Sequence, residues 1–330
     1  MTQPRLTTLL SWALVAFTID ADNAFELSMP HRTATDRRTG QLRSEPWLAS
    51  MFSWYACLQF VPAEGIELAE LNRLTFGECR LRGPNSGMIR WGYVTIEDRV
   101  VRPTEAGMRA SSKWAELPAL IEQRWVDRHG AGAVGRLRTA LESALGGIDY
   151  DLPDAVPENA AGDGRVDIAL RPVTEVDRPR DLAALLAKVL VDRTRTHEAA
   201  SGLSLSHAAN PIRALGAGDL PSRDFPRRTG VAKETLTAMT NWLAKQGFVA
   251  VTGAGRTKTV GLTDKGREAF EEYTHASEAA DEQLRGALEP IVAALDLTPP
   301  QGTWRAKRPT PETLPHHPVI SHRGGYPDGS

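Results

Sequence analysis

The sequence predicts an α-rich α+β chain in which one helix–helix–hairpin pattern occurs twice among long packing helices. Two observations lead to this fold class. Apolar residues recur at helical spacing through most of the chain, and two short β-runs around a turn lie between helices once in each half. We expect four parts: an N-terminal domain over 1–145, an acidic linker over 146–180, a C-terminal domain over 181–297 and an extended Pro/Gly-rich tail over 298–330.

Composition and charge exclude several classes of protein. Hydrophobic residues make up 41% of the chain and charged residues 24%, as in soluble globular proteins. The net charge of -2 excludes a protein that coats nucleic acid through bulk positive charge. The apolar stretch Leu9–Phe17 is too short to span a membrane and lacks the flanks of a signal peptide, so we expect a buried helix and no membrane contact.

The cysteines and histidines show no metal-binding spacing. Cys57 and Cys79 belong to no Cys-x-x-Cys or Cys/His cluster, so we expect neither a disulfide nor a zinc site, and a reducing cytoplasm as the compartment. His316, His317 and His322 lie in the tail without cysteines or a spaced carboxylate pair, and we expect no metal there. Because no catalytic constellation occurs, we expect neither an enzyme nor a cofactor.

The first half is expected to be helical up to a hairpin. Its glycines and Pro84 keep the helix before the hairpin short. The expected elements are a helix over 5–28, an apolar helix over 47–61, a short helix over 66–74, a short helix from Pro84 to Trp91, strands within 88–96 and over 100–103, and a long helix to about His129.

The second half repeats this order of helices and hairpin after the linker. The linker holds eight acidic and four basic residues, and a short strand over 166–170 is expected in it. Gly247 is expected to end the longest of its later helices, and Thr263 to cap the last one. The expected elements are helices over 181–201, 210–215, 222–228 and 232–246, strands over 248–251 and 258–262 around a turn, and a helix from Thr263.

Side chains divide the helix over 232–246 into two faces. Leu236, Met239 and Leu243, with Val231 before them, form an apolar face that would pack on the core. Short polar groups and a lysine occupy the other face, as is typical of a helix that bonds to base edges and phosphates in a DNA major groove. The residues 211–262 hold eight basic and three acidic side chains, which is the local positive charge that phosphate binding needs.

An internal repeat links the two halves. Gly92 corresponds to Gly247, and the Thr-Glu-Ala-Gly of 104–107 to the Thr-Asp-Lys-Gly of 263–266. The spacing between the paired glycines is 15 residues in the first copy and 19 in the second, so the first hairpin is shorter. Two copies of one module explain this pattern, and we expect both to be winged helix-turn-helix modules.

The second half resembles the MarR group of bacterial regulators. The resemblance lies in its turn, its polar helix, Gly-Phe-Val, its basic hairpin and Leu-Thr-Asp-Lys-Gly. The whole chain is similar to tandem winged-helix regulators of actinobacteria. The resemblance implies a repressor that binds palindromic double-stranded DNA as a homodimer and is often released by a small aromatic effector. Since this chain carries both modules, a monomer acting as a pseudo-dimer is expected beside a homodimer.

These patterns yield two sets of candidate site residues. The DNA-binding candidates in the first half are expected to act on phosphates, and a structural role for that module is equally open. The DNA-binding candidates are Arg223, Arg228, Lys233, Glu234, Thr235, Thr237, Thr240, Asn241, Lys245, Arg256, Lys258, Arg82 and Arg90. The candidates for an aromatic ligand are Trp12, Trp47 and Trp54, for which a place in the core is the alternative.

Two other functions fit a chain of this kind. A winged helix also serves as a protein-binding adaptor, or as a protein that sequesters a small molecule without binding DNA. A DNA glycosylase built on tandem winged helices would need a catalytic polar pair, and the sequence lacks a Gln-x-Gln-like signature. A DNA-binding regulator is therefore our main hypothesis and the adaptor our alternative.

Overall fold

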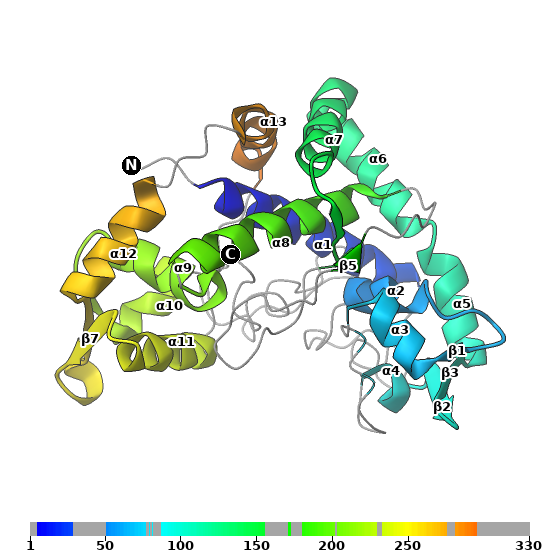
Figure 1. Cartoon of the computed structure of the whole chain (residues 1–330), viewed down its shortest axis with the longest axis horizontal. Helices are drawn as coiled ribbons and strands as arrows, with labels where there is room; N and C mark the ends of the chain where they lie inside the picture. The colour runs from blue at the N-terminus through cyan, green and yellow to red at the C-terminus, as the bar shows by residue number, and fades with distance from the viewer. Residues whose placement is uncertain are drawn as a thin grey trace.

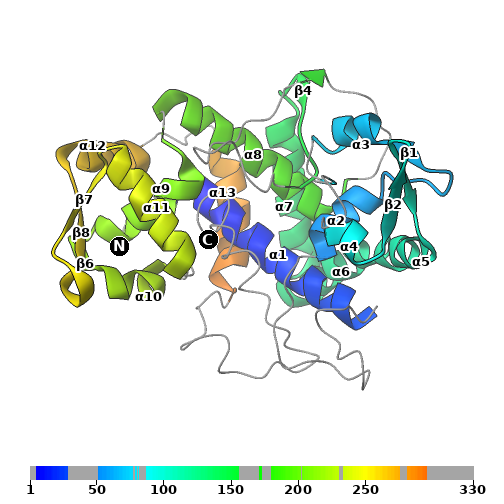
Figure 2. The ribbon, with the colours of Figure 1, turned by 90° about the horizontal axis from the view of Figure 1, so that it is seen from below.

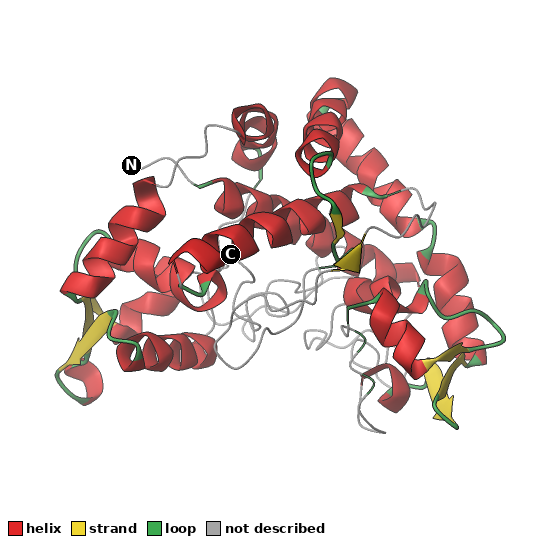
Figure 3. Cartoon of the chain, in the orientation of Figure 1, coloured by secondary structure: helices red, strands yellow, loops and turns green. Residues whose placement is uncertain are grey.

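The computed structural model describes residues 5–28, 51–76, 79, 81, 87–155, 171–172, 180–201, 203–229, 233–275 and 281–295. Within them the chain is mostly helical, with small antiparallel sheets, and the α-rich α+β class is confirmed (Figure 3). A body of long helices lies between two smaller units at opposite ends (Figure 1). No helix among the described residues is long and apolar enough to cross a membrane.

The body contains helices from both halves of the sequence. The apolar residues of α1 and α8 are buried almost completely, with Leu10, Phe17, Leu186 and Leu190 at 0% exposure, because these helices pack against each other and against the rest of the body. The body helices are α1 (Leu6–Ser28), α6 (Leu117–His129), α7 (Ala131–Leu145), α8 (Leu182–Ser201) and α13 (Glu282–Ala293).

The first module precedes α6 in the chain and shares its apolar core with the body. Its three strands form an antiparallel sheet in the order β1-β3-β2. The elements of the first module are α2 (Met51–Leu58), β1 (Ile66–Glu67), α3 (Leu68–Leu74), α4 (Gly87–Arg90), β2 (Val94–Glu97), β3 (Val100–Pro103) and α5 (Glu105–Trp114).

The second module follows α8 and has an apolar core of its own, which includes Ile212, Leu243 and Val260. Its sheet has the order β6-β8-β7, which is that of the first module. The elements of the second module are α9 (Leu205–Leu215), β6 (Leu220–Pro221), a 3-10 turn η1 (Ser222–Asp224), α10 (Phe225–Thr229), α11 (Lys233–Lys245), β7 (Val249–Thr252), η2 (Gly255–Thr257), β8 (Thr259–Leu262) and α12 (Asp264–His275).

The internal repeat extends to individual hydrogen bonds. Thr104 Oγ1 accepts from the Gly107 N–H at 3.1 Å and donates to the Gly92 carbonyl at 2.6 Å. In the second module Thr263 Oγ1 accepts from the Gly266 N–H at 3.0 Å and donates to the Gly247 carbonyl at 2.6 Å. Each threonine thus caps a helix and holds it to the start of the hairpin.

Both repeated pairs of glycines are required by backbone geometry. Gly92 and Gly247 each have φ of 78°, in the left-handed region where only glycine is unstrained. A Cβ on Gly107 would lie 2.0 Å from the Tyr93 carbonyl oxygen, and one on Gly266 would lie 1.9 Å from that of Phe248. The helix after each hairpin therefore packs directly on the hairpin backbone.

Several expected boundaries were wrong. The expected long helix to His129 is divided into α5 and α6. Pro118 has no N–H to bond the Trp114 carbonyl, so α5 does not continue as one helix. Helix α9 begins at Leu205 instead of residue 210, because the buried carboxylate of Glu198 accepts the Leu205 N–H and Pro211 lies inside the helix. The helix expected over 66–74 begins as strand β1, which pairs with β3.

The acidic linker is not free where it is described. Strand β4 (Tyr150–Asp151) pairs with β5 (Arg171–Pro172), and the segment after β4 is held on α8. The buried ammonium of Lys188 contacts Asp151 at 3.3 Å and Asp154 at 3.0 Å. Leu152 is buried at 3% exposure beside this ion pair. The strand expected over 166–170 lies outside the described residues, as does the tail over 298–330.

The expectation of free cysteines was also wrong. Cys57 on α2 and Cys79 before α4 form a disulfide, with Cα atoms 5.6 Å apart and both side chains buried. Their separation of 22 residues gave no sign of this, because only tertiary folding brings the end of α2 to the segment before α4. Cysteine usage therefore no longer supports a reducing compartment.

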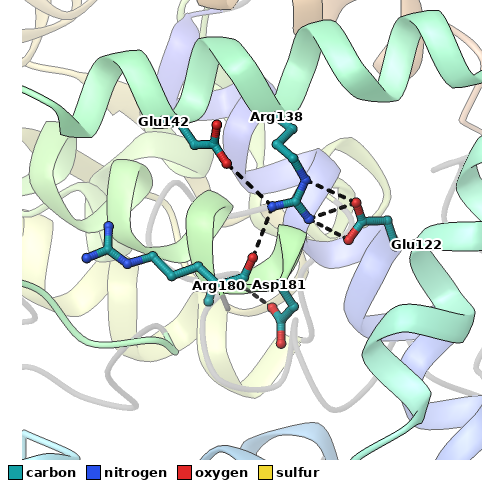
Figure 4. A network of polar contacts seen from close by, with 6 residues as sticks. Glu122, Arg138, Glu142, Arg180 and Asp181 are labelled. Carbon is teal, nitrogen blue, oxygen red and sulfur yellow. Dashed lines mark hydrogen bonds and ion pairs between the residues drawn. The ribbon is translucent and has the colours of Figure 1, made fainter. Parts of the chain in front are cut away.

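A network of polar contacts fixes the start of α8 to the α6–α7 hairpin (Figure 4). The Arg138 guanidinium binds the Glu122 carboxylate through bonds of 2.6 and 2.7 Å, lies 3.6 Å from Glu142, and donates to the Arg180 carbonyl at 3.0 Å. Asp181 accepts the Ala184 N–H at 2.8 Å as a helix cap. Burial, with a smaller contribution from the nearby carboxylates of Asp154 and Glu122, raises the pKa of Asp181 to about 6.

The Gly266→Ala and Gly107→Ala variants are each expected to lose about 2–3 kcal/mol of unfolding free energy, because the added methyl group collides with a carbonyl oxygen. The matched control is Gly135→Ala on α7, where nothing lies within 4 Å and helix propensity predicts a gain of about 0.5–1 kcal/mol. Urea unfolding measures all three. Equal stability of the Gly266→Ala and Gly135→Ala variants would show that α12 does not pack on the hairpin as described.

The Cys57→Ala/Cys79→Ala double variant is expected to unfold about 3 kcal/mol more easily under non-reducing conditions, because the bond closes a loop of about 22 residues. Mass spectrometry after denaturing alkylation without reductant measures the bond directly. The wild-type protein should take up no label, and the single variant Cys57→Ala should take up one. Two labels on wild-type protein would mean that the bond does not form.

Asp181→Asn is expected to stabilise the protein by about 2–3 kcal/mol at pH 8 and to have little effect at pH 4. The raised folded-state pKa makes the protonated carboxyl the favoured form, so its contribution is present below the unfolded pKa of 3.8 and is lost as pH rises through about 6. Asparagine keeps an acceptor for the Ala184 N–H. Urea unfolding between the two pH values, with the exposed Asp127→Asn as control, tests this; parallel pH profiles for Asp181→Asn and wild type would contradict it.

Candidate nucleic-acid interface

The inner side of α11 fixes its position in the second module. Leu236, Met239 and Leu243 are 3%, 2% and 0% exposed, and they pack in the module core with Phe248 and Val249 of the hairpin. The expected apolar face is therefore confirmed for the three residues whose side chains are described, while Val231 lies outside the described residues. Gly247 ends the helix as expected, with its positive φ.

The outer side of α11 is open to solvent. Thr237, Asn241 and Lys245 are exposed at intervals of four residues, and Thr240 beside them is partly buried. Four-residue spacing places the three exposed side chains in one row along the helix. The side chains of Lys233, Glu234 and Thr235 lie outside the described part of the chain.

The hairpin after α11 supplies two of the basic side chains. Strands β7 and β8 pair from Val249 with Leu262 to Thr252 with Thr259, which leaves residues 253–258 as the tip. Arg256 is exposed there and Lys258 is partly buried. The tip therefore extends a positive charge beyond the sheet, beside α11.

The 3-10 turn η1 and helix α10, which precede α11, supply two more arginines. Arg223 has a side chain 73% exposed and lies 3.9 Å from Asp224, and Arg228 is also exposed. An exposed ion pair of this length contributes little to stability, so Arg223 keeps its positive field toward solvent. The structure thus brings Arg223, Arg228, Lys245 and the hairpin tip into one small module.

Two basic residues of the second module that the sequence patterns did not single out lie at the start of α12. Lys265 Nζ donates to the Gln246 carbonyl at the end of α11, at 2.9 Å, and Arg267 donates to the Leu262 carbonyl at 2.8 Å. Both side chains are exposed. They follow the capping threonine, and only the docking of α12 on the hairpin shows that Lys265 lies beside the end of α11.

One counted arginine faces inward instead. Arg213 Nη1 donates to Thr8 Oγ1 at 2.9 Å, and its guanidinium lies 5.8 Å from the centre of the Trp12 ring. It therefore connects α9 to α1 of the body and does not add charge to the outer surface. A local charge count along the sequence includes Arg213 because it carries no information on direction.

A second set of contacts joins α12 to the body. Arg5 lies 4.6 Å above the Tyr273 ring and donates to His197 Nδ1 at 3.4 Å, and Tyr273 Oη lies 3.3 Å from Thr8 Oγ1. Burial, and then the charge of Arg5, lower the pKa of His197 to about 4, so the imidazole is neutral at neutral pH. These contacts fix the second module to α1 and α8.

The helix and hairpin tip of the first module expose less positive charge to a polyanion. Arg90 is exposed at the end of α4, whereas Arg82 lies outside the described residues. Its hairpin tip exposes Glu97, Asp98 and Arg99. The two modules thus share their fold but differ in surface charge.

The candidate ligand tryptophans are not brought together where they are described. Trp12 lies beside Arg213 of the second module, whereas Trp54 lies 4.5 Å from the Trp91 ring and 5.5 Å from the Tyr93 ring in the first module. Trp47 lies outside the described residues. Trp12 and Trp54 therefore do not form one site, and each packs in its own module junction. Among the described residues, no group of histidine, cysteine and carboxylate side chains could hold a metal ion.

Comparison of the chain with protein-family models, with curated proteins and with solved structures gave no match.

Proposed function

We propose that this chain is a sequence-specific, DNA-binding transcriptional regulator whose second module binds double-stranded DNA. The order α10, α11 and hairpin β7–β8 supports a winged helix-turn-helix, in which the second helix enters the major groove. The first module repeats this order, so the proposal is a tandem of winged helices in one chain. The observation that carries the proposal is the exposed polar row of α11 beside a basic hairpin tip.

The chemistry of this surface matches the two kinds of group that DNA presents. Threonine and asparagine side chains such as Thr237 and Asn241 donate and accept hydrogen bonds at base edges. Lys245 and Arg228 are suited to the phosphates that flank the groove. Arg256, on the hairpin tip, extends toward the adjacent minor groove, whose negative potential attracts arginine.

The resemblance to the MarR group supports the same function. Regulators of that group carry one winged helix per subunit and bind DNA as homodimers, whereas the two modules of this chain are joined by a common helical body. One copy would then take the place of a dimer, and a homodimer is the alternative. Because the proposed partner is chromosomal DNA, the proposed compartment is the cytoplasm. A small aromatic effector belongs to the resemblance and has no assigned site here.

Arg256→Ala is expected to weaken binding to every DNA sequence, by about tenfold at low salt, and to lower the salt dependence of binding by about one counterion, because one phosphate contact is lost. Shift assays over about 50–200 mM salt measure both quantities. The matched control is Arg136→Ala, an exposed arginine of α7, a helix of the body that lies away from α11 in Figure 1. A chain that shifts no DNA from its own upstream region would instead be an adaptor.

Thr237→Ala and Asn241→Ala are expected to have a different effect, because base contacts carry sequence preference. Each should reduce the discrimination between preferred and mutated sites by about 1–3 kcal/mol and leave the salt dependence unchanged. Competition with duplexes that carry single base changes measures the discrimination. Unchanged discrimination in both variants would remove α11 from the major groove.

A further inference from the structure

The two hairpins differ in the length of their tips. Strands β2 and β3 pair up to Glu97 with Val100, so only Asp98 and Arg99 form the turn. Both have positive φ, of 48° and 66°, as in the tight two-residue turns that suit a twisted hairpin. The second hairpin has six residues in its tip, 253–258. Its four extra residues, which include the 3-10 turn η2, make this tip larger than that of the first hairpin.

The hairpin tips also differ in charge. In the first hairpin the turn residues Asp98 and Arg99 carry no net charge, and the exposed Glu97 at the end of β2 adds one negative charge. The tip of the second hairpin carries Arg256 and Lys258 and no acidic residue. Near DNA, the two carboxylates would be repelled by phosphates that attract the two basic side chains.

The helices before the hairpins differ as well. Helix α4 spans Gly87–Arg90, one turn, while α11 spans Lys233–Lys245. Of the four residues of α4, Met88 is buried and Gly87 lies against the Trp54 ring, where a Cβ would come within 2.8 Å. One arginine, Arg90, is left exposed, whereas α11 exposes a row of polar side chains.

The two modules lie along the same edge of the molecule, so a duplex bound to one would pass near the other (Figure 1). Helices α11 and α4 both lie along the lower edge of the molecule in Figure 1, and the hairpins β7–β8 and β2–β3 lie at its opposite ends (Figures 1 and 2). A duplex lying against α11 along this edge would therefore pass near the first module. Phosphates there would meet a short hairpin with a negative tip.

We infer that one chain binds DNA asymmetrically: the second module occupies a single half-site, and the acidic tip of the first hairpin makes no phosphate contact. The target is then a non-palindromic duplex bound by one copy of the chain. This inference rests on the proposed DNA-binding function and replaces its pseudo-dimer with a single bound module, because two equivalent modules in one chain would instead bind two half-sites as a dimer does.

The test uses the full-length protein and the duplex that it enriches from a random pool of about four helical turns, so that two half-sites fit. Hydroxyl-radical footprinting should show one protected stretch of about 10–15 base pairs, with one chain per duplex. Arg99→Ala, on the first hairpin tip, should change Kd by less than about twofold. Arg256→Ala, its counterpart on the second, should raise Kd by about tenfold.

The possible outcomes distinguish this inference from the proposed DNA-binding function. Two protected stretches related by two-fold symmetry, or an Arg99→Ala defect as large as that of Arg256→Ala, would overturn the asymmetry and leave the DNA-binding function standing. Failure to enrich any duplex would overturn both. Circular dichroism of Arg99→Ala and Arg256→Ala shows that each variant is folded, so that a loss of binding reports the lost contact.

Discussion

The packing of α1 against α8 is the contact on which the arrangement of the whole molecule depends. Helix α1, with 23 residues, is about 35 Å long, and its two ends contact different modules. Near its start, Arg5 and Thr8 contact Tyr273 of the second module; near its end, Phe25 stacks on Trp114 and contacts Tyr55 of the first. The distance between the modules is therefore set by one pair of buried helices.

Polar contacts fix the segments that pack around α8. The side chains of Lys188 and Asp192 are buried on α8, and each has an ionic or hydrogen-bond partner: Lys188 binds Asp151 and Asp154, and Asp192 accepts from Tyr150 and Arg193. Buried charges are costly unless paired, so these contacts favour one arrangement of the segment after α7 on α8. Arg193 also binds Asp281 at 2.8 Å and so connects α8 to the start of α13.

The two modules show how one scaffold can carry two different surfaces. The threonine cap, the left-handed glycine and the glycine packed on a carbonyl recur in both because each satisfies a backbone requirement. The hairpin tip and the outer side of the helix before it have no such requirement, so their length and charge differ freely. The shared geometry is the basis for a tandem, and the differing surfaces are the basis for unequal roles in it.

The sequence by itself determined the elements and the repeat. Helical spacing predicted α1 and α8, the apolar residues of α11 predicted its buried side, and paired glycines and threonines predicted two hairpin modules of one shape. These signals are local, since caps and periodicity involve residues only a few positions apart. The sequence also predicted that polar and basic side chains would lie on the outer side of α11 and on its hairpin tip. For Thr237, Asn241, Lys245 and Arg256, the structure adds that they are exposed.

Tertiary structure decided which distant groups meet. It paired Cys57 with Cys79, turned Arg213 inward onto Thr8 and Trp12, placed Trp12 and Trp54 in different junctions, and brought Lys265 beside the end of α11. It also held part of the acidic linker on α8 through Lys188. The physical reason is the same in each case: the direction of a side chain and its partner depend on how helices pack across long separations in sequence, and neither composition nor periodicity records that.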